Sequence, residues 1–320
     1  MRGWIENTSD NWFILAISPA RSSEYVAFMP IGLRLTRSGR FKLRELYMGG
    51  NPYSDHTGFI CIPEYEKLAM AGFSDFIQKQ LKWDIFKLRE VFDPRFAVFL
   101  EKFSSRKFNV KQLDSTVCPF IVLPDSFDQY LKDFIGSNRR NSIRRCLKKI
   151  DGNELRVSHV NTDNLEEHIE ILISLHRLKW EKEQPGHILN MKRTIFRYFF
   201  KNNALLLPVL LYDNKPIAAI VDFVDQKKKT LSAYNSGWDK KYHKISPGSI
   251  LRAISIRYAI ENGLKIYDFL RGGESYKTSW YGAQERFNTN TIITRNNFQM
   301  TVVKNYQRSR NIFKRLKNRI

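Results

Sequence analysis

A group of functional side chains follows a short apolar segment in the last sixth of the sequence. The segment YDFLRGGESYKTSW covers residues 267–280 and opens with a strand-like run around Asp268. Beyond the glycine pair at 272–273 it carries a carboxylate, a phenol and an ammonium group, on Glu274, Tyr276 and Lys277. Groups of this kind transfer protons and stabilise developing charge when a fold holds them together. Because the glycine pair permits a sharp turn, the end of this strand is predicted to be a platform for chemistry.

A second stretch, HKISPGSI at residues 243–250, has the residues of a phosphate-binding helix start. A helix N-terminus offers unpaired N–H groups and the positive end of the helix dipole to phosphate oxygens. Ser246 and Ser249 would add hydroxyl donors, and Gly248 would allow close backbone approach. The alternative is an ordinary capped helix that ends at Gly263.

The elements that must position these residues alternate between strands and helices. Apolar periodicity predicts strands in the first half over 11–18, 24–35, 41–50, 84–91 and 108–124, with helices over 63–83 and from 126. In the second half it predicts helices over 139–150, 164–180, 191–202 and 246–263, and strands over 154–160, 204–212, 215–224, 230–238 and 264–270. Asp163 and Glu166 fit a capping box at the start of the second of these helices. The fold class is therefore predicted to be α/β with mixed sheets.

The specific residues resemble a known family. A hairpin, a loop, a helix that begins at Pro-Gly and a following strand resemble the core of the GNAT acyltransferase fold. SPGSIL before the helix and GLKIYDFLRGGESYK after it, with Trp280 three residues on, resemble the CelD-like acetyltransferase family, a cellulose-biosynthesis type akin to the FemAB peptidyl transferases. RRNSIRR at 139–145 and LHRLKW at 175–180 resemble it too. The resemblance is strongest over 118–295.

The resemblance implies two GNAT-like halves in tandem, of which the second carries the active site. We expect an N-terminal half over 1–136, a C-terminal half over 137–300 and a basic amphipathic helix over 301–320. The family usually has helical sequence ahead of its first hairpin, whereas this chain starts almost at that hairpin. The N-terminal half is therefore expected to be incomplete at its start.

The resemblance also implies roles for individual residues. In the implied fold, the strands before and after the Pro-Gly helix splay apart, and an acyl donor meets an acceptor amine in the gap. The pyrophosphate of acetyl-CoA or another acyl-CoA would lie on the first helical turn, at Ser246, Pro247, Gly248 and Ser249. The substrate would be contacted by Asp268, Arg271, Trp180, Arg140 and Arg144.

Three residues of the turn are the expected catalytic groups. Glu274 would accept the amine proton if an apolar setting raised its pKa, Tyr276 would donate to the leaving sulfur, and Lys277 would stabilise the oxyanion or grip an anionic group of the acceptor. Asp268 and Arg271 would orient these groups, or would simply form a structural ion pair. Trp280 and His176 are more easily explained as core residues.

The charge distribution points to anionic partners. The net charge is +21, and thirteen of these excess charges lie in 137–150 and 301–320, which contain no acidic residue. Phosphate-bearing cofactors, RNA and anionic membranes are all compatible with such a balance. Solvated helix faces, or a tail packed on its domain, would explain the same runs without any partner.

Other features exclude several protein classes. The longest apolar runs fall short of a membrane span, and no secretory signal is evident. Three widely spaced cysteines indicate a reducing compartment, and therefore a cytoplasmic location, with peripheral contact at the inner membrane face through the tail. The six histidines lack metal-ligand spacing, so no metal is expected.

The resemblance implies an acyl-CoA-dependent N-acyltransferase, and its acceptor class, an amine on an amino sugar or another cell-envelope or polysaccharide precursor, comes from the family and not from composition. Its acceptor is expected to be a small-molecule or lipid-linked anionic compound. Two alternatives stay open: an aminoacyl-tRNA-dependent transferase, which would use the basic surface for tRNA, and a non-catalytic basic binding protein on the same scaffold.

Overall fold

The structure is a computed structural model that describes residues 10–103, 106–151, 154–181, 183–274, 277–278, 282–303 and 305–306. It is mixed α/β, which confirms the predicted fold class, and it contains two mixed sheets. The described residues form two compact units. The first unit takes in the chain up to Thr116 and again from Phe287 onward, and the second runs from Val117 to Arg286.

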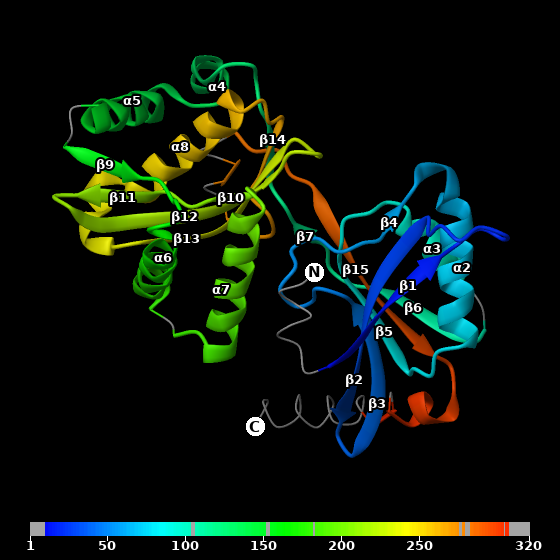
Figure 1. Ribbon diagram of the computed structural model, residues 1–320. Helices are drawn as coiled ribbons and strands as arrows, with labels where there is room; N and C mark the ends of the chain where they lie inside the picture. The colour runs from blue at the N-terminus through cyan, green and yellow to red at the C-terminus, as the bar shows by residue number, and fades with distance from the viewer. Residues whose placement is uncertain are drawn as a thin grey trace. The chain divides into compact units, whose positions relative to one another are not determined.

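The first unit is a sheet with two helices on one face (Figure 1), and Met300 and Val303 pack on Leu43 of its other face. Its elements are β1 (Asn11–Ile17), β2 (Ala27–Ser38), β3 (Phe41–Met48), β4 (Ile60–Cys61), η1 (Pro63–Tyr65), α2 (Glu66–Lys79), β5 (Ile85–Val91), α3 (Phe96–Glu101), β6 (Phe108–Gln112) and β15 (Phe287–Arg295). Its strand order is β1-β2-β3-β5-β15-β6. Phe73 and Ile77 of α2 pack on Ile31 and Leu46 of the sheet, and all four side chains are fully buried.

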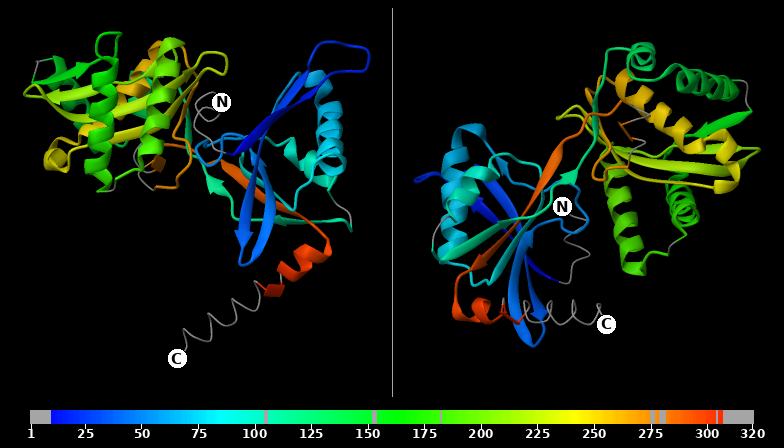
Figure 2. Two further views of the ribbon diagram at one scale, coloured as in Figure 1. Left: turned by 60° about the horizontal axis from the view of Figure 1, so that its bottom comes forward. Right: turned by 180° about the vertical axis from the view of Figure 1, so that it is seen from behind.

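Strand β15 comes from the end of the chain yet lies inside the first sheet. It pairs antiparallel with β5 on one side and with β6 on the other. Figure 2 shows this strand, in orange, running beside strands from the first third of the chain. Periodicity did not predict it, because FNTNTIITR carries polar residues at positions that an apolar sheet would fill. Asn288 and Asn290 are nevertheless buried, and their amides bond to Glu90 and Thr116.

The second unit has helices on both faces of its sheet (Figure 1). Its elements are β8 (Phe120–Val122), α4 (Phe127–Asp133), α5 (Ser137–Asp151), β9 (Leu155–Ser158), α6 (Leu165–Trp180), α7 (Gly186–Lys201), β10 (Leu205–Leu206), β11 (Val209–Tyr212), β12 (Lys215–Asp225), β13 (Thr230–Trp238), η2 (Lys240–Ile245), α8 (Pro247–Glu261) and β14 (Ile266–Asp268). The strand order is β8-β14-β13-β12-β11-β9. The short strand β7 (Thr116–Val117) spans the junction of the two units.

The long central strand β12 separates two cores. Ala218 and Ile220 face α8 and pack with Leu251 and Ile254. Ala219 and Val221 face the opposite way and pack with residues of α6 and α7. This alternation follows from the period of two in a strand. Because both faces are covered, the strand KPIAAIVDFV is apolar almost throughout.

The units begin and end at different residues from the predicted halves. The segment 117–136 belongs to the second unit, because β8 pairs with β14 and Tyr130 and Leu131 of α4 are buried in the core beneath α8. The segment 287–300 belongs to the first unit, because β15 pairs there. Most of the predicted tail helix, 301–320, lies outside the described residues.

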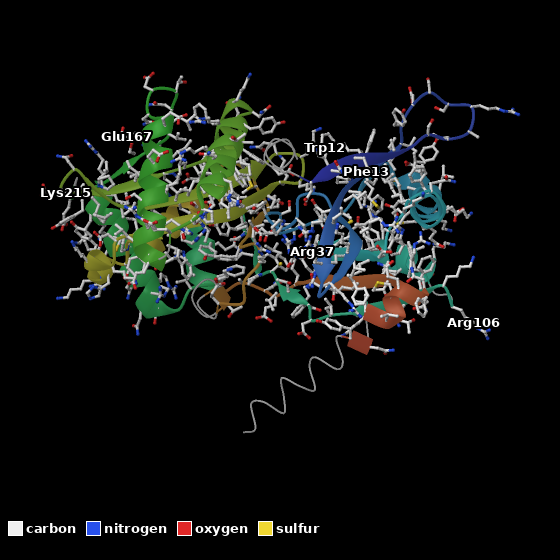
Figure 3. All side chains as sticks on the ribbon, turned by 90° about the horizontal axis from the view of Figure 1, so that it is seen from below. Trp12, Phe13, Arg37, Arg106, Glu167 and Lys215 are labelled. Carbon is white, nitrogen blue, oxygen red and sulfur yellow. The ribbon has the colours of Figure 1, made fainter. Side chains whose placement is uncertain are left out.

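Several local predictions also differ from the structure. The strand predicted over 108–124 is broken into β6, β7 and β8, and β14 is shorter than its apolar run. The capping box is wrong: Asn164 is the N-cap residue and makes no side-chain cap, while Glu166 pairs with Arg197 at 2.7 Å. Charged side chains such as Arg106 and Lys215 project outward at the periphery (Figure 3).

Candidate active site

The predicted splay of two strands is present in the second unit. β13 and β14 run parallel and pair only from Thr230 with Ile266 to Ser232 with Asp268. β14 then ends, whereas β13 continues to Trp238. The chain after β14 turns away at Leu270, whose φ is +57°. The second half of β13 therefore has no partner strand on this side among the described residues.

Helix α8 begins where β13 and η2 end, as its sequence predicted. Pro247 is its first residue, and Gly263, with φ of +68°, follows its last turn. Ser246 is the N-cap residue in a left-handed conformation and makes no side-chain cap; its carbonyl oxygen accepts from the N–H groups of Ser249 and Ile250. Ser246 thus occupies the predicted N-cap position, but its side chain does not cap the helix.

A pocket of about 270 Å³ lies beside this helix start. It is lined by the first turns of two helices, through Asn138, Arg139, Ser142, Ile143 and Cys146 of α5 and Ser246, Ser249 and Ile250 at α8. Two of the four predicted cofactor residues therefore line one cavity together with the basic helix. A Cβ atom at the third, Gly248, would meet Trp238 Cδ1 at 3.4 Å, an ordinary contact. The packing of the protein itself does not require glycine there.

The thiol of Cys146, which also lines this pocket, is not an activated nucleophile. Burial raises its pKa, and the nearby Lys149 and Arg145 oppose that shift only in part. A larger pocket of about 400 Å³ lies between β9 and the later turns of α8, lined in part by Arg156, His159 and Glu261. None of the predicted site residues lines it.

The turn after β14 is held by buried charges. Asp268 is 3 % exposed; its carboxylate pairs with Arg286 and accepts from the N–H of Leu270 at 2.8 Å. The predicted alternative partner, Arg271, is exposed. Asp268 thus fixes the backbone at the point where the chain leaves the sheet.

Lys277 is the central donor of the same turn. It is 4 % exposed, and its Nζ lies 2.9 Å from the carbonyl oxygen of Gly272, 3.3 Å from that of Arg271 and 3.5 Å from that of Phe269. Its fourth neighbour is Glu274 Oε2, at 2.8 Å. The ammonium group therefore closes the turn, which sequence reasoning did not foresee.

Glu274 does not have the electrostatic setting expected of a base. Partial burial acts to raise its pKa, but the hydrogen bond from Lys277 and the charge of Lys179 outweigh burial and lower the pKa below its ordinary value. The expected apolar tuning is therefore not found for this carboxylate, whose side chain is 47 % exposed. Tyr276 and Trp280 lie outside the described residues.

Sequence reasoning missed Lys179, next to the predicted Trp180 at the end of α6. Its Nζ donates to Ser236 Oγ of β13 at 3.2 Å and lies 4.9 Å from the centre of the Trp180 ring. Burial lowers its pKa to about 8, and Arg252 and Lys277 add to this, whereas Glu274 opposes it. Lys179 thus connects β13 electrostatically with the turn after β14. The sequence feature that could have pointed to Lys179 is its position on the same helix as His176, three residues further on.

No contact joins the remaining predicted substrate residues to this turn among the interactions described for the chain. Trp180 is 55 % exposed. Arg140 is half-buried on α5, next to the pocket residue Arg139, and Arg144 is exposed, with Asp128 3.7 Å away. In the described parts of the chain, no helix is long and apolar enough to cross a membrane, and no His, Cys, Asp and Glu side chains gather as a metal site would require.

The comparisons agree with this geometry. Residues 137–278 match the family model for the acetyltransferase (GNAT) domain. The structure is similar to FemX, with a TM-score of 0.62 and 11 % identity over 88 % of each chain. The chain has a tandem GNAT-like fold. It is also similar to a tandem GNAT protein from the clavulanic acid pathway, with a TM-score of 0.51 and 7 % identity, covering 90 % of this chain and 83 % of that one.

A third similar structure is the C-terminal domain of a putative lysylphosphatidylglycerol synthetase from Agrobacterium fabrum, with a TM-score of 0.50 and 10 % identity over 88 % of this chain and 84 % of that one. The comparison with curated protein sequences gave no match. The GNAT-domain match covers α5 to the turn after β14, so it contains the strand splay, the start of α8 and the Lys277 turn. Residues 137–278 thus match the GNAT acetyltransferase domain in sequence, and the similar solved structures show that the chain shares the tandem GNAT-like fold.

Proposed function

We propose that this protein is an acyl-CoA-dependent N-acyltransferase, an acetyltransferase of the CelD-like type, and that its second unit is catalytic. The observation that carries the proposal is the end of β13–β14 pairing beside a helix start whose pocket is lined by Ser246 and Ser249. Phosphate oxygens of the donor would lie at the positive end of the α8 dipole, where the N–H of Gly248 and the hydroxyl groups of Ser246 and Ser249 could donate to them. Its thioester would then extend toward the gap between the strands.

The reaction itself needs no metal. The acceptor nitrogen attacks the thioester carbonyl, a C–N bond forms, the C–S bond breaks, and the thiolate takes up the proton that the nitrogen has lost. An oxyanion exists between these steps and is stabilised by nearby donors. Tyr276 remains our proposed donor to the sulfur. We assign Lys277 to the shape of the turn, where its charge still acts on the gap, and Glu274 to holding Lys277.

The acceptor is proposed to be an amine on an amino sugar or another cell-envelope or polysaccharide precursor. This part rests on the resemblance of the 246–280 motif. The reducing cytoplasm is the proposed location, because acyl-CoA is made and used there.

Binding of acetyl-CoA, measured by calorimetry, tests the donor. Gly248→Val should weaken binding by about tenfold or more, because its side chain would occupy the space where the pyrophosphate approaches the backbone. Gly186→Val is the matched control: Gly186 also starts a helix, and a Cβ atom there would meet nothing within 4 Å. Equal affinity in wild type and folded Gly248→Val would remove the assignment.

A second candidate donor is aminoacyl-tRNA. It is supported by the similarity to FemX over 88 % of both chains and by the net charge of +21. Filter binding of charged and uncharged tRNA at several salt concentrations separates the candidates, since each phosphate contact steepens the loss of affinity with salt. Tight binding of charged tRNA with no affinity for acetyl-CoA would replace the first proposal. Binding of neither would leave a non-catalytic basic protein.

We also propose that the basic tail, 301–320, contacts anionic membrane surfaces. Seven basic and no acidic residues support this. Removing 307–320 should reduce co-sedimentation with vesicles that contain phosphatidylglycerol at low salt, and should leave binding to neutral vesicles unchanged. If removal instead unfolds the first unit, the tail is part of its core.

A further inference from the structure

The larger cavity of the second unit has no part in the proposed transfer. Its volume is about 400 Å³, and it lies among β9, the later turns of α8 and the last turn of α5. This volume falls in the range of roughly 300–1,000 Å³ that is typical of small-molecule sites. The lining consists of four aliphatic residues, Ile150, Leu155, Val157 and Ile254, and five polar ones, Arg156, His159, Arg257, Tyr258 and Glu261.

The aliphatic part of this lining belongs to the apolar core. Leu155 and Ile254 are buried, and Ile150 and Val157 pack against the same cluster between α8 and the sheet. Protein interiors are normally filled to the density of organic crystals. A cavity that opens onto core side chains therefore offers apolar surface that a ligand can bury.

The polar residues of the lining carry more positive than negative charge. Arg156 is exposed on β9, and the side chain of Arg257 on α8 is 38 % exposed. Glu261 is the acid of the lining; its side chain is 63 % exposed, and its Oε1 lies 3.9 Å from Arg257 Nε. An exposed pair at this distance contributes little. Because a guanidinium group has five N–H donors, Arg257 can bind a ligand as well.

Two neutral donors accompany the guanidinium groups. Desolvation, followed by the charges of His168 and Arg257, lowers the pKa of the His159 imidazole. The ring is therefore neutral at pH 7 and can donate one hydrogen bond. Tyr258, half-buried next to Arg257 in sequence, adds a hydroxyl donor. The lining thus combines charged and neutral donors with an apolar surface.

Hydrogen bonds fix the walls of the cavity. Where α5 leads to β9, Lys149 Nζ lies 2.7 Å from Glu154 Oε1, and the N–H of Glu154 donates to the carbonyl oxygen of Lys149 at 2.9 Å. Beyond β9, Asn164 Nδ2 donates to the carbonyl oxygen of His159 at 3.0 Å, and the N–H of Asn161 donates to Asn164 Oδ1 at 2.7 Å. A preformed site loses little free energy to ordering when a ligand binds.

A solvated surface explains only part of this arrangement. Arg257 and Glu261 are four residues apart on one helix, which is the common spacing of an exposed ion pair. Arg156 lies on an edge strand, where charged side chains are frequent. These patterns account for the charges but not for the open apolar cavity that the three side chains share.

We infer that this cavity binds a small amphiphilic anion, an organic acid or a phosphate ester with an apolar body. Its carboxylate or phosphate oxygens would accept from Arg156 and Arg257, since a guanidinium group can bind either anion in a bidentate manner. Its apolar body would lie on Ile150 and Ile254. The ligand class follows from this pairing of guanidinium groups with aliphatic side chains in one cavity.

The site is separate from the proposed donor pocket at the start of α8. Tyr258 lies ten residues beyond Gly248 on the same helix, which corresponds to about 15 Å along its axis. The two cavities have no lining residue in common. Binding in the larger cavity therefore does not depend on which donor the second unit uses.

Methyl NMR of the full chain, labelled at the isoleucine δ1 carbons, tests the site. Ile150 and Ile254 line the cavity, Ile143 lines the donor pocket, and Ile169 is fully buried against the opposite face of the sheet. Ile150→Val and Ile254→Val assign the two cavity resonances. Phenyl phosphate and benzoate are titrated separately. At least one should give NOEs from its ring protons to the methyl groups of Ile150 and Ile254, and both should leave Ile143 and Ile169 unmoved.

Two further probes separate the charge of the ligand from its apolar body. Inorganic phosphate lacks the body and benzyl alcohol lacks the charge, so each should bind about tenfold more weakly than the better acid, or weaker still. NOEs with phenyl phosphate alone identify a site for phosphate esters, and NOEs with benzoate identify one that accepts carboxylates. Three results overturn the inference: no NOE with either acid, equal affinity for benzyl alcohol, or a response of Ile143 without Ile150 and Ile254.

Charge-removing variants test recognition by the two arginines. Arg156→Gln and Arg257→Gln should each weaken binding of the acid by about tenfold and leave the unfolding temperature unchanged, because neither side chain is buried. Arg37→Gln removes the same charge from an exposed position of the first unit, labelled in Figure 3, and should bind as wild type. Unchanged affinity in both cavity variants, with methyl spectra that show an intact fold, would refute the site.

Discussion

The charged residues of the turn after β14 are engaged with one another, which limits what each can do in catalysis. Glu274 pairs with Lys277, and Lys277 also donates to three backbone carbonyls. A carboxylate with a lowered pKa is a weaker base than a free one. Glu274 is therefore better suited to holding Lys277 than to taking a proton from an amine.

This arrangement makes Glu274→Gln a mild substitution. The amide oxygen can still accept from Lys277, so we expect turnover to fall by less than about tenfold, compared with about 100- to 10,000-fold for loss of a positioned base. Release of the CoA thiol, with an amino sugar as acceptor, measures this. Glu167→Gln, exposed on α6 and visible in Figure 3, is the control. A loss of 100-fold or more, together with a lost acidic limb in the pH profile, would restore Glu274 as the base.

Asp222 of β12 gives the second unit an unusual pH dependence. It is fully buried, and burial raises its pKa to about 6, although Arg252 Nη1 at 3.6 Å acts against this. The folded state thus keeps a proton that the unfolded state has released. As pH rises from about 4 to about 6, this group should lower the free energy of unfolding, by roughly 3 kcal/mol for a shift of about two units.

Urea unfolding of wild type and Asp222→Asn between pH 4.5 and 7 measures this contribution. The asparagine cannot titrate, so the variant should lack this fall in stability with rising pH. Because the substitution also removes the countercharge of Arg252, it changes absolute stability as well, and the slope of stability against pH is the decisive quantity. Identical slopes in the two proteins would contradict the assignment to Asp222.

At the scale of elements, two glycines lie next to the proposed site, and the packing requires glycine at only one of them. A Cβ atom at Gly237 would overlap the backbone of α6, whereas one at Gly248 would make an ordinary contact with Trp238. We expect Gly237→Ala to lower the free energy of unfolding by about 1–3 kcal/mol, because the helix must move away from β13. Gly248→Ala should leave stability unchanged or slightly raised, since alanine favours helix.

Chemical denaturation of the two alanine variants, side by side, measures the difference. Gly237→Ala should also weaken the contact between Lys179 and Ser236, and so shift the side-chain NMR resonance of Lys179. If both variants unfold at the same denaturant concentration, α6 does not depend on Gly237 for its position.

The same two positions show what the sequence could and could not predict. The Ser-Pro-Gly start of α8, and the glycine that ends it, are local signals, and both were read correctly. The need for glycine at 237 arises from a helix some sixty residues earlier in the chain, so nothing local reveals it. The strong periodicity of β12 and α6 likewise predicted those elements, because burial of their apolar faces is encoded residue by residue.

The candidate site was predictable in part for the same reason. Short spacings in the sequence were enough to group two sets of residues: Ser246 with Ser249, and Asp268 with Glu274 and Lys277. The electrostatic interaction of Lys179 with Glu274 joins residues almost a hundred positions apart in the chain. The lowered pKa of Glu274 depends on which way Lys277 points. Such effects come from tertiary packing, which periodicity does not describe.

At the scale of the whole molecule, the order of strands in the first sheet decides which parts of the chain fold together. β15 lies between β5 and β6, yet it follows the entire second unit in sequence. The first unit is therefore discontinuous, and the second is a continuous insertion between Thr116 and Phe287. Division of the chain at 136 and 300, as the family resemblance implied, would cut through both sheets.

Two fragments test this organisation. Residues 117–286 should fold alone with a single cooperative thermal transition, because they contain every strand from β8 to β14 and lack only part of β7. Residues 137–300 should be less stable or aggregate. They lack β8 and α4, which contribute the buried residues Ile121, Tyr130 and Leu131 to the core beneath α8, and they carry β15 without its partners. Loss of several large buried side chains typically costs a few kcal/mol each.

Circular dichroism melting and hydrogen exchange of the β12 amides compare the fragments with the full chain. Protection of β12 in 117–286 should approach that in the full chain, since its neighbours β11 and β13 and its covering helices are all retained. A third fragment, 1–286, provides the complementary control: without β15 its first unit should lose protection in β5 and β6, while β12 stays protected. If 137–300 instead folds cooperatively and 117–286 does not, the second unit begins at α5, and β8 with α4 belongs to the first.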